Sequence, residues 1–216
     1  MSKRGAFLMW AWVAFIGYAM FLAPSDDPGY LRQLITMDDP DPLLLSVFSM
    51  LGMFPIAFTI LLIRNDEHKW PAMIFALASF GLGAFALMPY FAWVTGIPSR
   101  PLRFPKKVIA AVQHPVLLGI LGLGVIGLVL YGVISGDYGL YSRAFMESSF
   151  VHVMTIDFFV LTGLSVYALH WDAEKRNISV TPWLGLLPVI GILLYIGMTR
   201  NQRWKNGTET DNPEGS

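Results

Sequence analysis

The segment from Phe150 to His170 is a run of 21 mostly apolar residues that carries an aspartate, Asp157, near its middle. An apolar run of this length is typical of a helix that crosses a lipid bilayer. A carboxyl group near the centre of such a helix costs roughly 2.5–3.5 kcal/mol on insertion scales. Protonation, a partner on another helix or a wet cavity must therefore compensate for it, and Asp157 is a candidate functional residue.

The rest of the chain has the composition of a membrane protein. Of its 216 residues 55% are hydrophobic and 14% are charged, whereas soluble domains average about 25% charged residues. We predict an all-α, polytopic integral membrane protein of one domain with about six transmembrane helices, followed by a disordered polar tail over 200–216. The predicted spans cover 6–23, 43–63, 71–94, 115–135, 150–170 and 182–198.

Two of these spans contain internal prolines, and one is rich in glycine. Pro55 and Pro89 each remove a backbone donor and should kink their helices, and the carbonyl groups that they free need other partners. The five glycines of the span 115–135 indicate a crowded central helix, or a helix that faces a bulky planar ligand. We expect Asp157 to face the bundle interior, with this glycine-rich span as its neighbour.

The loop before the fourth span is the most basic part of the chain. Arg100, Arg103, Lys106 and Lys107 are predicted to bind lipid headgroups, because basic residues at a membrane surface are attracted to anionic lipid. With six spans, eight basic residues fall on one side and seven on the other, so the positive-inside rule gives no majority. The basic N-terminus and the acidic loop over 24–42 favour a cytoplasmic N-terminus.

Other classes of site receive no support from the sequence. The formal net charge is zero, which does not suggest nucleic acid as a partner, and the chain has no cysteine for a disulfide, a thiolate site or a nucleophile. The histidines form no His-x-x-x-His pair or cluster, so no metal site is predicted and no cofactor is evident.

His152 and Asp157 lie five residues apart, which does not make them neighbours on a regular helix. They can meet only across a kink or a π-bulge. Three interpretations stay open. Each side chain binds its own partner and fixes the packing, or the two transfer protons or polarise a ligand, or a histidine ligates a haem or a metal.

The sequence SSFVHVMTIDFF, Ser148 to Phe159, resembles the signature of the abscisic-acid-deficient, neoxanthin-synthesis family of small plastid and cyanobacterial membrane proteins. His152 and Asp157 match a histidine and an aspartate that lie five residues apart on a membrane helix of that family. The resemblance covers roughly 81–200, with LMPYFAWV over 87–94, the dibasic pair over 106–107 and LLPVIGIL over 186–193 in the same order. The first two predicted spans lie outside the family's four-helix core, and the polar run that precedes its histidine helix is missing here.

This resemblance implies a role in carotenoid or xanthophyll metabolism in a photosynthetic membrane, either a cyanobacterial thylakoid or plasma membrane or a chloroplast membrane. An isomerase-type step would use Asp157 and His152 as catalytic proton donor and acceptor on an apolar pigment or lipid-like ligand. A bound carotenoid or chlorophyll, membrane lipids and photosynthetic complexes are the implied partners. Two alternatives remain: a non-enzymatic assembly or anchoring factor for a photosynthetic complex, and a small proton-coupled transporter.

Overall fold

The computed structural model describes residues 3–26, 28–94, 101–179 and 181–200, and the predicted polar tail lies outside them apart from Arg200. The described residues form helices and no strand, which confirms the all-helical class. Four helical stretches among these described residues are long and apolar enough to cross a membrane. They contain α1 (Lys3–Phe21), α3 (Pro42–Leu62), α7 (Pro115–Ser135) and α9 (Ser149–Arg176).

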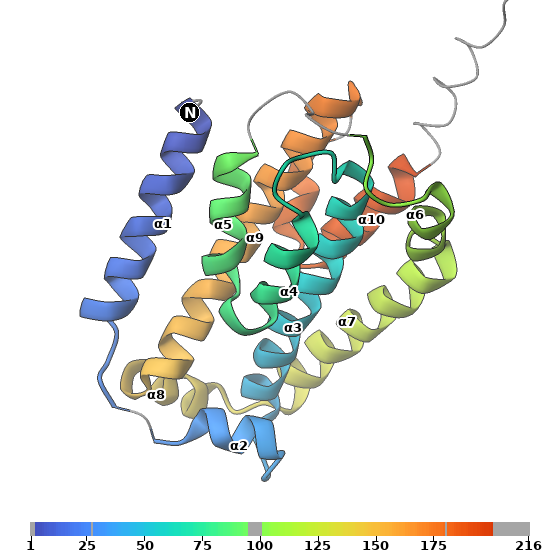
Figure 1. Ribbon diagram of the computed structural model, residues 1–216. Helices are drawn as coiled ribbons and strands as arrows, with labels where there is room; N and C mark the ends of the chain where they lie inside the picture. Colours follow the sequence, from blue (N-terminus) through green and yellow to red (C-terminus); the bar gives the residue numbers. More distant parts are fainter. Residues whose placement is uncertain (1–2, 27, 95–100, 180, 201–216) are drawn as a thin grey trace, which may run out of the picture.

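These four helices run between two ends of a bundle (Figure 1). The N-terminal end, as we call it, holds the start of α1, the end of α3 and the end of α9, and the short α6 (Lys106–Val112) lies there as well. The opposite end is covered by two short helices, α2 (Tyr30–Thr36) and α8 (Tyr138–Glu147), and we call it the α2–α8 end.

The segment expected to be the third crossing helix is a hairpin. It consists of α4 (Ala72–Leu82) and α5 (Ala84–Trp93), which run side by side in opposite directions (Figure 1). The rings of Trp70 and Trp93, at the two ends of the hairpin, lie 6.0 Å apart. The prediction of one continuous helix over 71–94 is therefore wrong. The chain reverses at Gly83, whose φ of +51° and ψ of −130° suit a residue without a Cβ atom.

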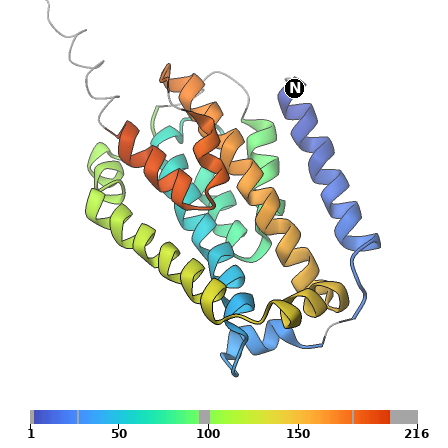
Figure 2. The same cartoon turned by 180° about the vertical axis from the view of Figure 1, so that it is seen from behind.

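The segment over 182–198 also turns back on itself. A 3₁₀ turn, η2 (Pro182–Leu186), packs along α9 and is followed by α10 (Ile190–Thr199). Gly185 lies directly on the backbone of α9 at Val166, with no room for a Cβ atom. The end of α10 is back at the N-terminal end of the bundle, since the Arg176 Nη1 donates to the Thr199 carbonyl oxygen over 3.4 Å (Figure 2).

Helix α7 lies at the edge of the bundle, against α3 and α10. Most of its surface is exposed, and a Cβ atom built on Gly119, Gly122, Gly124 or Gly127 would meet no other atom within 4 Å. Only Gly132 of the helix packs closely, against Ser46 of α3. The prediction of a crowded central helix is wrong here, because glycine permits a close approach but does not determine what approaches.

Candidate functional site

The carboxyl group of Asp157 lies at the tip of the α4–α5 hairpin. The side chain is only 7% exposed, and its Oδ1 accepts a hydrogen bond of 2.8 Å from the backbone N–H of Ala84. A Cβ atom on Gly83 would overlap the Asp157 carboxyl group, so a glycine is required at the tip on this ground as well as for its backbone angles. The prediction that Asp157 faces the interior of the bundle is confirmed.

The same hydrogen bond explains how α5 begins. The first N–H groups of a helix have no partner within the helix, and they carry the positive end of the helix dipole. No side chain of the neighbouring residues caps α5, because Gly83 precedes it. Asp157 supplies the missing acceptor from α9, so its partner is the third predicted span and not, as expected, the glycine-rich span 115–135.

Helix α1 supplies a second interaction with the hairpin. Pro89 lies inside α5, and its missing N–H leaves the carbonyl of Phe85, four residues earlier, without its helical partner. The indole Nε1 of Trp12 donates to this carbonyl oxygen over 2.8 Å, and the ring of Phe15 stacks on that of Phe85 at 4.1 Å. The expected need for an outside partner at Pro89 is met by a neighbouring helix.

His152 binds a different set of partners from Asp157. Its Nδ1 lies 2.9 Å from the carbonyl oxygen of Phe145, and its Nε2 lies 2.6 Å from the hydroxyl of Tyr18. Because a carbonyl oxygen can only accept, Nδ1 carries a proton and donates it to Phe145, while Nε2 and the Tyr18 hydroxyl share a second hydrogen bond. The ring also stacks on that of Phe145 with 4.3 Å between the centroids, and the centroid of the Tyr18 ring lies 5.7 Å away.

The two candidate catalytic residues are therefore held separately. Helix α9 is α-helical throughout, without the π-bulge that would bring His152 toward Asp157. Five residues of helix correspond to about 7.5 Å along the axis. Asp157 contacts the hairpin tip, and His152 joins α9 to α1 and α8 at the α2–α8 end. A catalytic role for Asp157 and His152 stays a prediction.

A buried ion pair that was not predicted from the sequence lies at the N-terminal end. Arg64 is 1% exposed and donates to both carboxylate oxygens of Asp172, with Nε–Oδ1 at 3.2 Å and Nη2–Oδ2 at 2.5 Å. The Asp172 carboxylate also accepts from the Tyr195 hydroxyl at 2.7 Å and from the Asn65 amide. Arg64 Nη1 donates to the Thr199 hydroxyl at 2.9 Å. This network joins η1 (Ile63–Asn65), the 3₁₀ turn that follows α3, to α9 and α10.

Helical periodicity contains a signal for this pair. The apolar face that carries Asp157 continues through Leu161, Leu164 and Ala168 in steps of three and four residues, and the next step of four reaches Asp172. The predicted span over 150–170 leaves Asp172 in a loop, but α9 continues through it to Arg176. A charged residue at a core position of a helix indicates a buried partner.

Further charged residues lie where the α4–α5 hairpin begins and ends. Arg103 lies 3.2 Å from the buried Asp66 carboxylate through Nε, and its Nη2 donates to the His68 carbonyl oxygen over 3.0 Å. Burial raises the pKa of Asp66, although the N–H of Ala72 and the charge of Arg103 oppose this shift. Burial lowers the pKa of His68, and the positive charge of Lys175 adds to the effect.

The four basic residues predicted to bind headgroups are not equivalent. Arg100 lies outside the described residues. Arg103 is engaged with Asp66 and the loop after α3, which is a structural role. Lys106 and Lys107 are exposed at the start of α6, at the N-terminal end. Binding of lipid by these residues stays a prediction.

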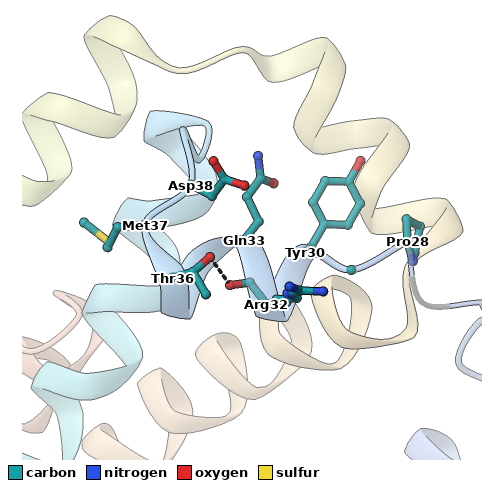
Figure 3. Close-up of a pocket in the computed structure, with 8 residues that line it drawn as sticks. Pro28, Tyr30, Arg32, Gln33, Thr36, Met37 and Asp38 are labelled. Atoms are coloured by element: carbon teal, nitrogen blue, oxygen red, sulfur yellow. Dashed lines mark hydrogen bonds between the residues drawn. The ribbon is translucent and has the colours of Figure 1, made fainter.

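The described residues offer no group of three or more His, Cys, Asp or Glu side chains that could hold a metal ion. A hollow beside α2 is lined by residues 28–30, 32, 33 and 36–38 (Figure 3). It is open to the outside at the α2–α8 end, and the Thr36 hydroxyl there bonds the Arg32 carbonyl of its own helix at 2.8 Å. This hollow is separate from Asp157.

Comparison with known proteins adds no relative. The chain matches no protein-family model, no curated protein and no solved structure. The candidate site is therefore defined by its geometry: a buried carboxyl group at the tip of a helical hairpin, in a bundle of apolar helices.

Proposed function

We propose that this chain is an integral membrane protein that acts on an apolar, carotenoid-like ligand, with Asp157 as the proton-donating group. The single observation that carries the proposal is the placement of Asp157: an acidic side chain, 7% exposed, at the tip of a hairpin inside an apolar bundle. An acid in such a place is expensive and is by default a functional group.

The exposed surface supports the membrane part of the proposal. Large apolar side chains are outside on α1 and α7, among them Trp10 at 74%, Leu123 at 71% and Ile134 at 76% exposure. Soluble proteins rarely expose contiguous apolar areas of this kind, whereas lipid covers them without cost. The polar residues Arg64, Asp66 and Asp172 are instead buried.

The chemistry that fits the site is an isomerisation. Oδ1 of Asp157 accepts the Ala84 N–H, so Oδ2, which lies against Gly83, is the oxygen that can carry a proton. Protonation of a polyene or an epoxide oxygen, followed by loss of a proton elsewhere on the same molecule, balances without an oxidant or a cofactor. The resemblance around His152 and Asp157 suggests a xanthophyll as the substrate and a photosynthetic membrane as the location.

The test is the Asp157→Asn variant in a strain that lacks the chromosomal gene. The amide oxygen still accepts the Ala84 N–H, so we expect normal membrane abundance and a carotenoid profile like that of the deletion strain. Gly83→Ala is the control for structure, because it disrupts the hairpin tip and should lower abundance. A wild-type profile with Asp157→Asn would refute catalysis by this carboxyl group.

The deletion strain also distinguishes the other two functions. A normal carotenoid profile with missing photosynthetic complexes would support an assembly factor. Transport is favoured by one observation: the hairpin turn at Gly83 places the N-terminus of a half-length helix, α5, at a buried carboxylate, and half-helix N-termini point at anionic groups in the substrate sites of transporters. Accumulation of a substrate in vesicles that an uncoupler abolishes would support that alternative.

A further inference from the structure

Both ends of each hairpin lie at the N-terminal end of the bundle. Trp70 and Trp93 place the two ends of the α4–α5 hairpin together, and Arg103 donates its backbone N–H to the Asp66 carbonyl at 3.1 Å, so the chain is still at this end after α5. The hydrogen bond from Arg176, at the end of α9, to Thr199, at the end of α10, shows that the hairpin of η2 and α10 also begins and ends at the N-terminal end. Neither hairpin carries the chain to the α2–α8 end.

The hairpins are also too short to cross a bilayer. Helix α4 has 11 residues and α5 and α10 have 10 each, which is about 15–17 Å at 1.5 Å per residue. The hydrocarbon core of a bilayer is about 30 Å thick. A non-helical backbone at this depth must be buried in protein, and the turn at Gly83 meets that condition because it contacts Asp157 of α9.

This topology changes the distribution of charge. Ten of the described basic residues lie at the N-terminal end of the bundle: Lys3, Arg4, Arg64, Lys69, Arg103, Lys106, Lys107, Lys175, Arg176 and Arg200. Two lie at the α2–α8 end, Arg32 of α2 and Arg143 of α8. The near-even distribution expected for six spans arises only when each hairpin is counted as a crossing.

From this asymmetry we infer that the chain crosses the membrane four times, with both hairpins entering from the cytoplasmic face and both ends of the described chain on that face. Loops rich in Lys and Arg are retained on the cytoplasmic side, and all the connections here are short enough for the rule to apply. The N-terminal end then faces the anionic headgroups of the cytoplasmic leaflet. This inference rests on the membrane part of the proposed function and not on the role of Asp157.

The chain contains no cysteine, so a single cysteine introduced at a chosen site is the only one that a thiol reagent can label. Six exposed sites are suitable: Asp38 and Ser142 at the α2–α8 end, and Lys69, Lys107, Ser179 and Arg200 at the N-terminal end. Each is replaced by Cys in the full chain, expressed in a bacterium and treated with a membrane-impermeant maleimide before and after the spheroplasts are lysed.

We expect Asp38→Cys and Ser142→Cys to label in intact spheroplasts, and the other four to label only after lysis. Labelling of Lys69→Cys and Lys107→Cys from opposite faces would overturn re-entry of the α4–α5 hairpin, and Ser179→Cys and Arg200→Cys test the second hairpin in the same way. The reverse pattern at all six sites would overturn the orientation. Affinity tags at the two chain ends, which change no residue of the bundle, must both resist protease in intact spheroplasts.

The outcome is independent of the test of catalysis. Extraction of the chain by alkaline carbonate would refute the membrane part of the proposed function and the topology together. A changed labelling pattern in a carbonate-resistant protein would refute the topology alone. The carotenoid profile with Asp157→Asn affects neither result.

Discussion

Replacing Asp172 by alanine tests the buried ion pair at the N-terminal end. The variant removes both charge-assisted hydrogen bonds from Arg64, at 3.2 and 2.5 Å, and the 2.7 Å bond from the Tyr195 hydroxyl. Arg64 keeps its bond to Thr199, but at 1% exposure its charge has no access to water. The variant therefore leaves a buried cation without its counter-ion.

The expected magnitude follows from this burial. Removing one partner of a buried ion pair costs about 3–5 kcal/mol, because the other charge stays buried without compensation. For a chain of this size that corresponds to a fall of roughly 10 °C in the unfolding temperature. The double variant Arg64→Met/Asp172→Leu should recover part of the loss, since it leaves no unpaired charge.

The assay is thermal unfolding of the purified protein in detergent, followed by tryptophan fluorescence. Glu174→Ala is the matched control, because Glu174 carries the same charge on the same helix but its ion pair with Arg4 is exposed. Exposed pairs contribute about 0–1 kcal/mol, so this variant should unfold within a few degrees of the wild type. Equal unfolding temperatures for Asp172→Ala and Glu174→Ala would refute the reasoning.

Three further outcomes are expected. Trp12→Phe should lower stability by about 1–3 kcal/mol, because it leaves the carbonyl freed by the proline of α5 without a donor, whereas Trp10→Phe, at an exposed ring, should have no effect in the same unfolding assay. Burial lowers the pKa of His68 from its ordinary value of 6.5. At a pH below about 6.5, His68 therefore binds a proton more readily in the unfolded chain than in the folded one. Stability should therefore fall as the pH drops below about 6.5, and His68→Gln should remove this part of the pH dependence; parallel curves for the two proteins would contradict it. Replacing Lys106 and Lys107 by glutamine should weaken retention of anionic lipid in mixed micelles by about 2 kcal/mol without changing the unfolding temperature, and unchanged retention would mean that these lysines do not bind headgroups.

Parts of the candidate site follow from the order of residues alone. The cost of an acid in an apolar helix is enough to predict that Asp157 faces the interior, and that prediction is confirmed. Its partner was not predictable, because the Ala84 N–H becomes an unpaired donor only when the chain turns at Gly83 and a new helix starts. Pro89 indicated a free carbonyl group, but not that Trp12, on a different helix, would bind it.

The sequence by itself determined the helical class and the apolar character of the segments, because both depend on composition and on runs of neighbouring residues. The tertiary structure decided which apolar segments run straight and which turn back. The apolar run over 71–94 has the right hydrophobic length either for one crossing helix or for a hairpin of two half-length helices, so hydropathy cannot distinguish them. The difference lies in contacts between distant residues, such as Gly83 with Asp157 and Arg64 with Asp172, which form only when the helices pack.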